Sequence, residues 1–372
     1  MVDIPYGGNL QKKIRIIINM KIQLTQKKEI FNFCKPYVIA ELGSNHNGDM
    51  KLAKKMIIEA KEAGADCVKF QSWSKDSIFA TKKYEDNYFI ADDYRDRDDF
   101  TLAEIVEEYS ISEDELLEMK KFADEIGIDC TSTPFNKKEA DFLVDKLNTS
   151  FIKVASMDLN NYPFLEYLAK KGKPIVISTG LSELYEIDKA VKTIECAGNK
   201  NIIILHCVST YPPIDNDVNL NNIKTLMSTY PDYPIGFSDH TLGTAIPLAS
   251  VALGACLIEK HFTLDKDMEG WDHKVSATKD EMVDIVENAA RISDALGSFR
   301  ITATESSEKK KEFRRSIVLT KKLNKGEVIT YDDIDYKRPG GALDPELTEF
   351  IVGRTVNKNL QYDHILTKED II

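Results

Sequence analysis

From Pro36 onward, short apolar runs alternate with longer amphipathic stretches. Each apolar run ends in polar residues, the pattern typical of a buried parallel strand. We expect strands at 37–42, 67–70, 128–131, 151–154, 174–177, 202–205, 235–237 and 256–258. Between them apolar positions recur at helical spacing, as in 51–63 and 280–296. Eight alternating strand and helix units predict a (β/α)8 TIM barrel of class α/β, with a doubly wound open sheet as the alternative.

The two ends of the chain have a different pattern. After Gly297 a charged stretch predicts a linker over 299–313, and residues 323–334 (LNKGEVITYDDI) are then echoed by 360–371 (LQYDHILTKEDI). Both copies place Thr three residues before Asp, the spacing of a small helical cap. We therefore expect a small β-rich domain over 314–372, after a barrel over 36–298. Residues 1–35 are predicted to be an extension with a β-hairpin at 21–33, and translation could start at Met1 or Met20.

Composition narrows the class of protein. The chain has 372 residues and a formal net charge of -12, which argues against a nucleic-acid partner. Its six cysteines are scattered singly, without a Cys-x-x-Cys pair, which indicates reduced core residues in a cytoplasmic protein. Apolar runs stay well below the roughly 20 residues that span a bilayer, and the N-terminal segment lacks the features of a signal peptide.

Polar side chains follow the predicted strands, where a barrel collects its chemistry. The strand ends carry, in chain order, Glu41, Lys69 with Gln71, Thr133, Lys153 with Ser156 and Asp158, Ser178, Ser209 with Tyr211, Ser238 with His240, and His261. One polar strand end is usually no more than a capped turn. The repetition at all eight ends indicates an active site.

Two histidines occupy matched positions in this series. His240 and His261 each end a strand, and the small apolar segment 245–253 between them suits a crossover helix, so the two strands should be parallel neighbours. Two neutral imidazoles with open positions beside them predict a site for a divalent transition metal. The alternative is a pair of structural histidines, each satisfied by a local hydrogen bond. Asp239 and Glu259 beside them favour the metal site.

Two lysines are predicted to face the same barrel mouth. Lys69 and Lys153 both follow apolar runs, and hydroxyl residues stand at the neighbouring strand ends. Such a set suits a small molecule with both a carboxylate and a phosphate, although a lysine at a strand end can also be an exposed terminal charge. The long segment 72–111 holds clustered acidic residues without the spacing of an EF-hand, which predicts a charged lid.

The motifs together resemble the sialic acid (N-acetylneuraminate) synthase family, which includes legionaminic and pseudaminic acid synthases. The resemblance runs from about Tyr37 to the C-terminus. It rests on IAELGSNHNG (39–48), VKFQ (68–71), TSTPF (131–135), KVAS (153–156), STG (178–180), FSDHT (237–241), EKHF (259–262), DHK (272–274) and KRPG (337–340). The last motif is similar to the family's antifreeze-like domain.

The resemblance implies a reaction. Phosphoenolpyruvate would condense with an open-chain N-acylated mannosamine-type aldose, giving a nonulosonic acid and phosphate. His240 and His261 would hold a divalent metal, with Mn²⁺ favoured over Mg²⁺ or Co²⁺. Phosphoenolpyruvate would be bound by Lys69, Thr133, Lys153, Ser156, Ser178, Ser209 and Ser238. Gln71, Tyr211, Asp272 and Arg338 would bind the sugar, and Glu41, Asp158 and Asp272 would be catalytic.

The resemblance also implies a homodimer in which the C-terminal domain crosses to the partner barrel and Arg338 completes the partner's site. Three departures leave the sugar open. Asp158 stands where N-acetylneuraminate synthases have Glu, Ser209 where they have Asn, and Trp271 where they have a small residue or Pro. N-acetylmannosamine and a diacetamido trideoxy sugar both remain candidates. A metal-dependent aldolase or hydrolase, and a carbohydrate-binding or ice-binding protein, are the rival functions.

Overall fold

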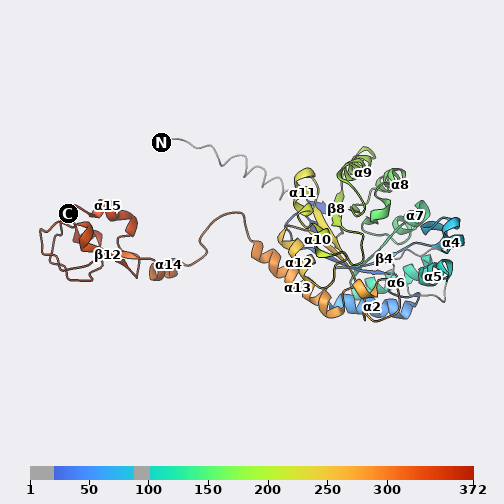
Figure 1. Ribbon diagram of the computed structural model, residues 1–372, viewed down its shortest axis with the longest axis horizontal. Coiled ribbons are helices and arrows are strands. Elements are labelled where there is room, and N and C mark those ends of the chain that lie inside the picture. The colour runs from blue at the N-terminus through green and yellow to red at the C-terminus, as the bar shows by residue number, and fades with distance from the viewer. Residues whose placement is uncertain (1–20, 88–100) are drawn as a thin grey trace. The chain divides into compact units, whose positions relative to one another are not determined.

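The computed structural model describes residues 21–87 and 101–372, and within them eight parallel strands form one nearly closed sheet (Figure 1). The strands follow the order β5-β4-β3-β10-β9-β8-β7-β6, so the first strand of the barrel, β3, pairs with the last, β10. The predicted TIM-like barrel is confirmed. The bounds are β3 (Tyr37–Gly43), β4 (Cys67–Gln71), β5 (Asp129–Thr133), β6 (Ile152–Val154), β7 (Ile175–Ser178), β8 (Ile202–Cys207), β9 (Ile235–Asp239) and β10 (Leu257–His261).

Helices connect successive strands and cover the outside of the barrel (Figure 1). They are α2 (Met50–Glu62), α6 (Glu113–Ile126), α7 (Lys137–Asp145), α8 (Tyr162–Ala169), α9 (Leu184–Cys196), α10 (Asp215–Val218), α11 (Asn222–Thr229), α12 (Ala245–Ala252) and α13 (Lys279–Leu296). The segment expected to be one charged lid contains helices α3 (Lys75–Ile78), α4 (Thr81–Asp86) and α5 (Leu102–Tyr109). Its acidic cluster at 92–99 lies outside the described residues.

Alternation along each strand explains how the barrel is filled. Successive side chains point to opposite faces, so one set packs against the helices and the other points into the barrel. The inner set includes Ile39, Val176 and Ile203, all fully buried. An N-terminal hairpin, β1 (Ile22–Gln23) with β2 (Glu29–Ile30), adds Ile22 and Ile30 to this inner cluster.

The hairpin also closes the barrel at the end where the strands begin. The side-chain oxygen of Asn32 accepts a 2.7 Å hydrogen bond from the backbone of Ile235, the first residue of β9. Phe33 donates its backbone N–H to Gly254, which precedes β10. A pocket for substrate is therefore left to the opposite end, where the strands finish.

The second compact unit comprises Ser298–Ile372. It contains α14 (Ser307–Phe313), an antiparallel pair of β11 (Ser316–Leu319) and β12 (Ile334–Lys337), and α15 (Thr348–Ile351). The internal repeat predicted from sequence is a structural repeat, because Leu323 and Leu360, equivalent positions of the two copies, exchange backbone hydrogen bonds. The segment predicted as a linker includes α14, and Lys311 on that helix accepts a hydrogen bond from Gly340.

Each repeat copy ends in a buried aspartate that caps its own turn. Thr330 with Asp333, and Thr367 with Asp370, form capping boxes. Both aspartates are almost completely buried and pair with a lysine twelve residues upstream, Lys321 and Lys358. Burial opposes ionisation of Asp370, but Lys358, His364 and the Thr367 amide outweigh it and lower the pKa of Asp370 to about 2.

Asp370→Asn is therefore expected to destabilise the second unit by about 1.5 to 3 kcal/mol, the usual worth of hydrogen bonds to a charged group. Because the folded pKa of Asp370 is depressed, its contribution is complete above the unfolded pKa of about 3.9 and is lost as pH falls toward 2. Amide exchange of residues 316–371 in the full chain measures the change. Asp332→Asn, which removes the same charge from an exposed aspartate of the other repeat copy, is the matched control and should change stability little.

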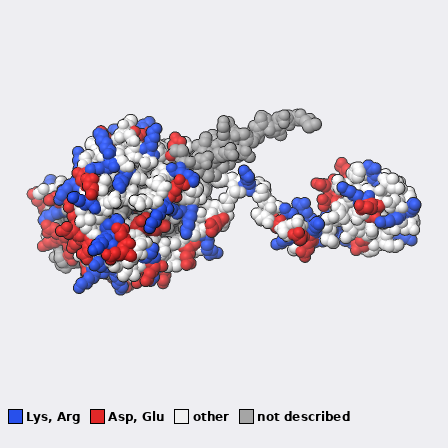
Figure 2. Space-filling view, turned by 180° about the vertical axis from the view of Figure 1, so that it is seen from behind, with Lys and Arg blue, Asp and Glu red and all other residues white. Residues whose placement is uncertain are grey.

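Charged side chains of both signs lie side by side over the described residues on the face shown in Figure 2. In residues 21–87 and 101–372, no helix combines the length and apolar character needed to cross a membrane.

Candidate active site

A cavity of about 770 Å³ opens where the barrel strands end. Its walls contain residues from all eight strands or from the loops that follow them. The residues predicted for the site that line it are Glu41, Lys69, Gln71, Thr133, Lys153, Ser156, Ser178, Ser209, Tyr211, Ser238, His240, His261 and Asp272. Residues from distant parts of the sequence converge here because all parallel strands finish at the same end of the barrel.

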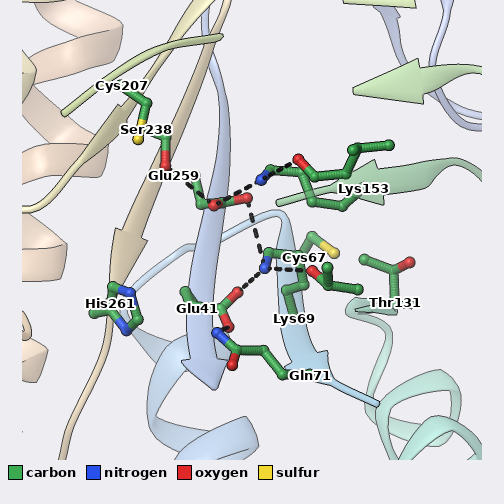
Figure 3. A network of polar contacts seen from close by, with 12 residues as sticks. Glu41, Cys67, Lys69, Gln71, Thr131, Lys153, Cys207, Ser238, Glu259 and His261 are labelled. Atoms are coloured by element: carbon green, nitrogen blue, oxygen red, sulfur yellow. Dashed lines mark hydrogen bonds and ion pairs between the residues drawn. The ribbon is translucent and has the colours of Figure 1, made fainter. Parts of the chain in front are cut away.

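Two lysines and two glutamates form a buried ion-pair network at the floor of the cavity (Figure 3). Lys69 is paired with Glu41, and its Nζ lies 3.8 Å from the Glu259 carboxylate. The Nζ of Lys153 lies 3.5 Å from the other oxygen of Glu259. All four side chains are less than a tenth exposed. When Glu41 is ionised the charges of the network balance, and an incoming anion finds two cations that are held in place by carboxylates.

The two carboxylates have opposite pKa shifts. Burial raises the pKa of Glu41 to about 7, although Lys69 attracts its charged form, and repulsion from Glu259 acts in the same direction as burial. Burial also opposes ionisation of Glu259, but Lys153 and Lys69 outweigh it and lower the pKa of that carboxyl. Glu259 therefore acts as a permanent counter-ion, whereas Glu41 can gain or lose a proton near neutral pH.

Hydroxyl groups surround the two lysines. Lys69 donates to Thr133 Oγ1 at 3.0 Å, and Ser238 donates to Glu259 at 3.2 Å. The hydroxyl of Ser178 is buried and has no hydrogen-bond partner. Gly180 has no side chain, which allows Ser156 and Ser209 to lie close to its backbone. A Cβ at position 180 would lie 2.2 Å from Ser209 Oγ and 2.7 Å from Ser156 Oγ.

The two predicted histidines lie side by side on one wall of the cavity. Their ring centroids are 5.4 Å apart, as expected for residues at the ends of the paired strands β9 and β10. His240 Nδ1 lies 2.7 Å from the Val208 carbonyl oxygen, which fixes the ring and leaves Nε2 for another partner. Tyr211 packs on His240 with centroids 4.0 Å apart.

His261 has a buried Nδ1 with no hydrogen-bond partner, 3.8 Å from Asp272 Oδ2. Burial, and then the nearby His240, hold the pKa of His261 well below its usual range, so its imidazole is neutral. A neutral ring with an unused buried nitrogen, beside a second imidazole, fits two nitrogen ligands of a divalent metal. Among the described residues, no group of three or more His, Cys, Asp or Glu side chains is arranged to hold a metal, so water or substrate would supply the other ligands.

Trp271 lines another wall of the cavity and packs against two buried aromatic side chains. The two tryptophans of the chain stack, with Trp73 and Trp271 centroids 5.4 Å apart, and Tyr109 packs on Trp271 at 5.6 Å. Trp73 donates to Gln71, which in turn donates to Glu41 at 3.1 Å. These aromatic side chains are thus connected to the ionisable floor through Gln71.

Comparison with protein families decides the assignment. Residues 56–300 match the NeuB family and residues 314–372 match the SAF domain. The chain belongs to the NeuB family. This confirms the resemblance to sialic acid synthases and the prediction of an enzyme.

This NeuB chain is also similar to individual proteins over most of its length. It is 43% identical over 337 residues to an uncharacterized protein of Methanocaldococcus jannaschii, covering 90% of this chain and 94% of that one. It is 36% identical over 340 residues to N,N'-diacetyllegionaminic acid synthase of Legionella pneumophila, again covering 90% and 94%. A solved structure of N-acetylneuraminic acid synthetase from Leptospira borgpetersenii matches with a TM-score of 0.69 and 32% identity, covering 78% of this chain and 96% of that one. Other relatives are named N-acetylneuraminate-9-phosphate synthase and pseudaminic acid synthase.

Asp158 is the one residue of the barrel unit predicted for the NeuB site that is not among those that line the cavity. Asp158 lies in the short helix η1 (Ser156–Asp158) and accepts a hydrogen bond from Asn161. Arg338 belongs to the second unit, where its guanidinium lies over Phe313, 5.0 Å from the ring centroid. The shorter side chain of Asp158, compared with Glu, is consistent with its place outside the cavity wall.

Three residues near the site make contacts that only the structure reveals. Glu259 points into the barrel because it lies two positions before His261 on β10, and this period of two was the signal for its role. Cys207 lies 3.9 Å from His240 Nδ1 and 3.6 Å from Ser156 Oγ. Asp239 points the other way and forms a fully buried ion pair with Lys260 at 2.7 Å, so it supports the strand ends rather than the cavity.

Proposed function

We propose that this NeuB family enzyme condenses phosphoenolpyruvate with the open-chain aldehyde of an N-acylated mannosamine-type sugar. A bond forms between C3 of phosphoenolpyruvate and C1 of the sugar, and the aldehyde oxygen takes up a proton to become a hydroxyl. Water adds at C2, and the C–O bond to phosphate then breaks. The water oxygen becomes the ketone oxygen of a nonulosonic acid, and inorganic phosphate leaves with the bridging oxygen.

The buried pair of Lys69 and Lys153 is the observation that carries this proposal. Their two ammonium groups lie on one cavity floor and share the counter-ion Glu259. Phosphoenolpyruvate carries a carboxylate and a phosphate, and both need charge-assisted hydrogen bonds when water is excluded. The unpartnered hydroxyl of Ser178 and the neighbouring hydroxyls of Ser156 and Ser209 add donors. A simple aldolase or hydrolase would not require this second buried lysine.

Glu41 is the group best suited to move a proton. Its pKa near 7 lets it accept a proton from the attacking water and release it later in the cycle. Lys69 and Gln71 both contact its carboxylate, so the orientation of Glu41 is fixed. Asp272 lies next to His261, the strand partner of Glu41, where it can hold a hydroxyl of the sugar.

His240 and His261 are the residues that would hold a divalent metal, and we favour Mn²⁺ over Mg²⁺ or Co²⁺. When bound, such an ion would act as a Lewis acid toward the aldehyde oxygen of the sugar. The support is the neutral His261 ring, its unused Nδ1, and the Val208 contact that leaves Nε2 of His240 available.

The sugar is proposed at the level of a class. Relatives at similar identity are named legionaminic, pseudaminic and N-acetylneuraminate-9-phosphate synthases, so a diacetamido trideoxy sugar is the alternative to N-acetylmannosamine. Trp271, which stacks on Trp73, gives the cavity an apolar surface, which favours a substrate with an apolar substituent such as a methyl group.

Incubation of the purified protein with phosphoenolpyruvate and a panel of 2-acetamido and 2,4-diacetamido aldoses tests the reaction. We expect phosphate release that requires both substrates, with a 2-keto acid formed in equal amount. Phosphate release without an aldose, or cleavage of a nonulosonic acid to pyruvate and sugar without phosphate, would instead indicate a hydrolase or an aldolase.

We also propose a homodimer in which the second unit of one chain crosses to the barrel of the other. Exposed apolar residues support this, because Met157 and Leu181 line the cavity and are each more than half exposed, as are Ile214 and Leu242 in the segments that follow β8 and β9. Surfaces of this kind mark sites of protein association. Arg338 would then reach the partner's sugar, since a planar guanidinium suits hydroxyl and acyl oxygens.

Mixing an Arg338→Ala chain with a His240→Ala chain is expected to restore activity. Each homodimer would lack one group in both of its sites, whereas the heterodimer would have one site with both groups intact. Activity after subunit exchange, measured as phosphate release, should reach about a quarter of the wild-type value for random pairing of equal amounts. An exchanged mixture that stays inactive would contradict the shared site, and a mixture of two His240→Ala preparations is the control.

A further inference from the structure

The loop between Phe262 and Ala277 carries Asp272 into the cavity. It leaves β10 directly after His261 and closes on itself, because Phe262 and Ala277 are bridged and Ala277 donates its N–H to the carbonyl of His261. Its regular structure is limited to the short helix η2 (His273–Val275). The position of Asp272 therefore depends on what holds the loop.

Asn45, in the turn after β3, holds the base of this loop. Its side chain is fully buried, and Nδ2 donates to the Phe262 carbonyl at 2.9 Å and to Ser276 Oγ at 2.8 Å. Ser276 Oγ in turn donates to the carbonyl of Asp272 at 2.6 Å. One carboxamide thus connects both ends of the loop and, through Ser276, the backbone of Asp272.

Asn47 holds the tip. Its Nδ2 donates to the Glu269 carbonyl at 2.7 Å, and its Oδ1 lies 3.2 Å from His273 Nε2. The other ring nitrogen of His273 lies 2.7 Å from Thr263 Oγ1, which ties the tip back to the base. Gly270 makes room for the contact between Asn47 and His273, since a Cβ at position 270 would lie 2.6 Å from His273 Nε2 and 2.7 Å from Asn47 Oδ1.

We propose that Asn45 and Asn47 are positioning residues that set Asp272 beside His261. They lie four and six residues after Glu41. One segment therefore supplies the Glu41 carboxylate to the cavity floor and also holds the loop that carries Asp272. The functional part of this inference rests on the proposed role of Asp272 at the sugar, whereas the holding of the loop stands on the hydrogen bonds alone.

This arrangement predicts a separation of kinetic effects. Lys69 and Lys153 come from β4 and β6 and make none of the contacts to the loop, so phosphoenolpyruvate binding should survive release of the loop. Turnover should fall when the loop is released, because displacing the Asp272 carboxylate by about 1 Å can lower the rate by up to about a hundredfold.

Asn45→Ala and Asn47→Gly test the proposal in the full chain. Glycine is chosen at position 47 because the backbone there has a φ of 50°, which glycine adopts without strain. We expect amide exchange in residues 262–277 to accelerate about fivefold or more, and turnover to fall about tenfold or more, with the affinity for phosphoenolpyruvate changed less than about twofold. Asn47→Asp, which keeps the acceptor toward His273, should recover part of the turnover.

Asn199→Ala is the matched control. This asparagine is also buried and donates to two backbone carbonyls, those of Ala169 and Lys173, but it precedes β8 at the other end of the barrel. Its loss should leave turnover and loop exchange unchanged. Unaltered exchange in 262–277 of both test variants, or faster exchange with unchanged turnover, would overturn the proposal. Absence of product with every aldose would overturn the proposed reaction, and the exchange rates would still decide whether the asparagines hold the loop.

Discussion

His261→Ala is expected to lower turnover at least about a hundredfold, because it removes a nitrogen from the proposed metal site and a bound divalent ion contributes several kcal/mol to stabilising developing charge. His240→Ala should have the same effect. Chelation of the wild-type enzyme should abolish turnover, and Mn²⁺, Co²⁺ or Mg²⁺ should restore it. Titration calorimetry with Mn²⁺ alone measures the binding without relying on activity.

His206→Gln is a suitable control for these variants. His206 is buried on the neighbouring strand β8 with Nε2 2.6 Å from the Val218 carbonyl oxygen, and it is not among the residues that line the cavity. Its replacement should leave Mn²⁺ affinity unchanged. Full turnover of His240→Ala and His261→Ala in metal-free buffer would refute the metal site and leave the histidines a structural role.

Lys153→Ala is expected to weaken phosphoenolpyruvate far more than the sugar. A hydrogen bond to a charged group is worth about 1.5 to 3 kcal/mol, so the affinity should fall about tenfold or more. The relevant measurements are the KM for each substrate and the Kd of phosphoenolpyruvate alone. An unchanged KM for phosphoenolpyruvate with a raised KM for the sugar would place Lys153 at the other substrate.

The ion-pair network adds a complication that a second variant resolves. Removing Lys153 leaves Glu259 with Lys69 as its remaining cation, 3.8 Å away, so part of the loss could come from an unbalanced buried charge. Lys153→Met combined with Glu259→Gln restores the balance. If Lys153 binds phosphoenolpyruvate, the double variant regains stability but not affinity for that substrate.

The barrel was predictable because its signal is local. Strands buried on both sides need short, continuous apolar runs, and the amphipathic helices between them need apolar residues at helical spacing. The ends of each strand are therefore visible in the sequence to within three residues. Helices within the segment between β4 and α6 were not predicted, because their local signal is weak. Helices α3 and α4 are too short to show a period, and charged residues dominate them.

The sequence by itself determined the barrel, the C-terminal repeat and the family, because strand periodicity, repeated motifs and strand-end residues are properties of consecutive positions. It also indicated which residues gather at one end, since parallel strands in a barrel finish together. Only the tertiary structure decided which charged side chains pair with one another and which of them can exchange a proton. Glu259 serves two lysines, Glu41 has a pKa near 7 and Asp239 pairs with Lys260 outside the cavity, because these depend on distances between different strands and on burial. The contacts of Asn45 and Asn47 with a loop more than two hundred residues away belong to the same class, since no local pattern encodes a hydrogen bond across the barrel.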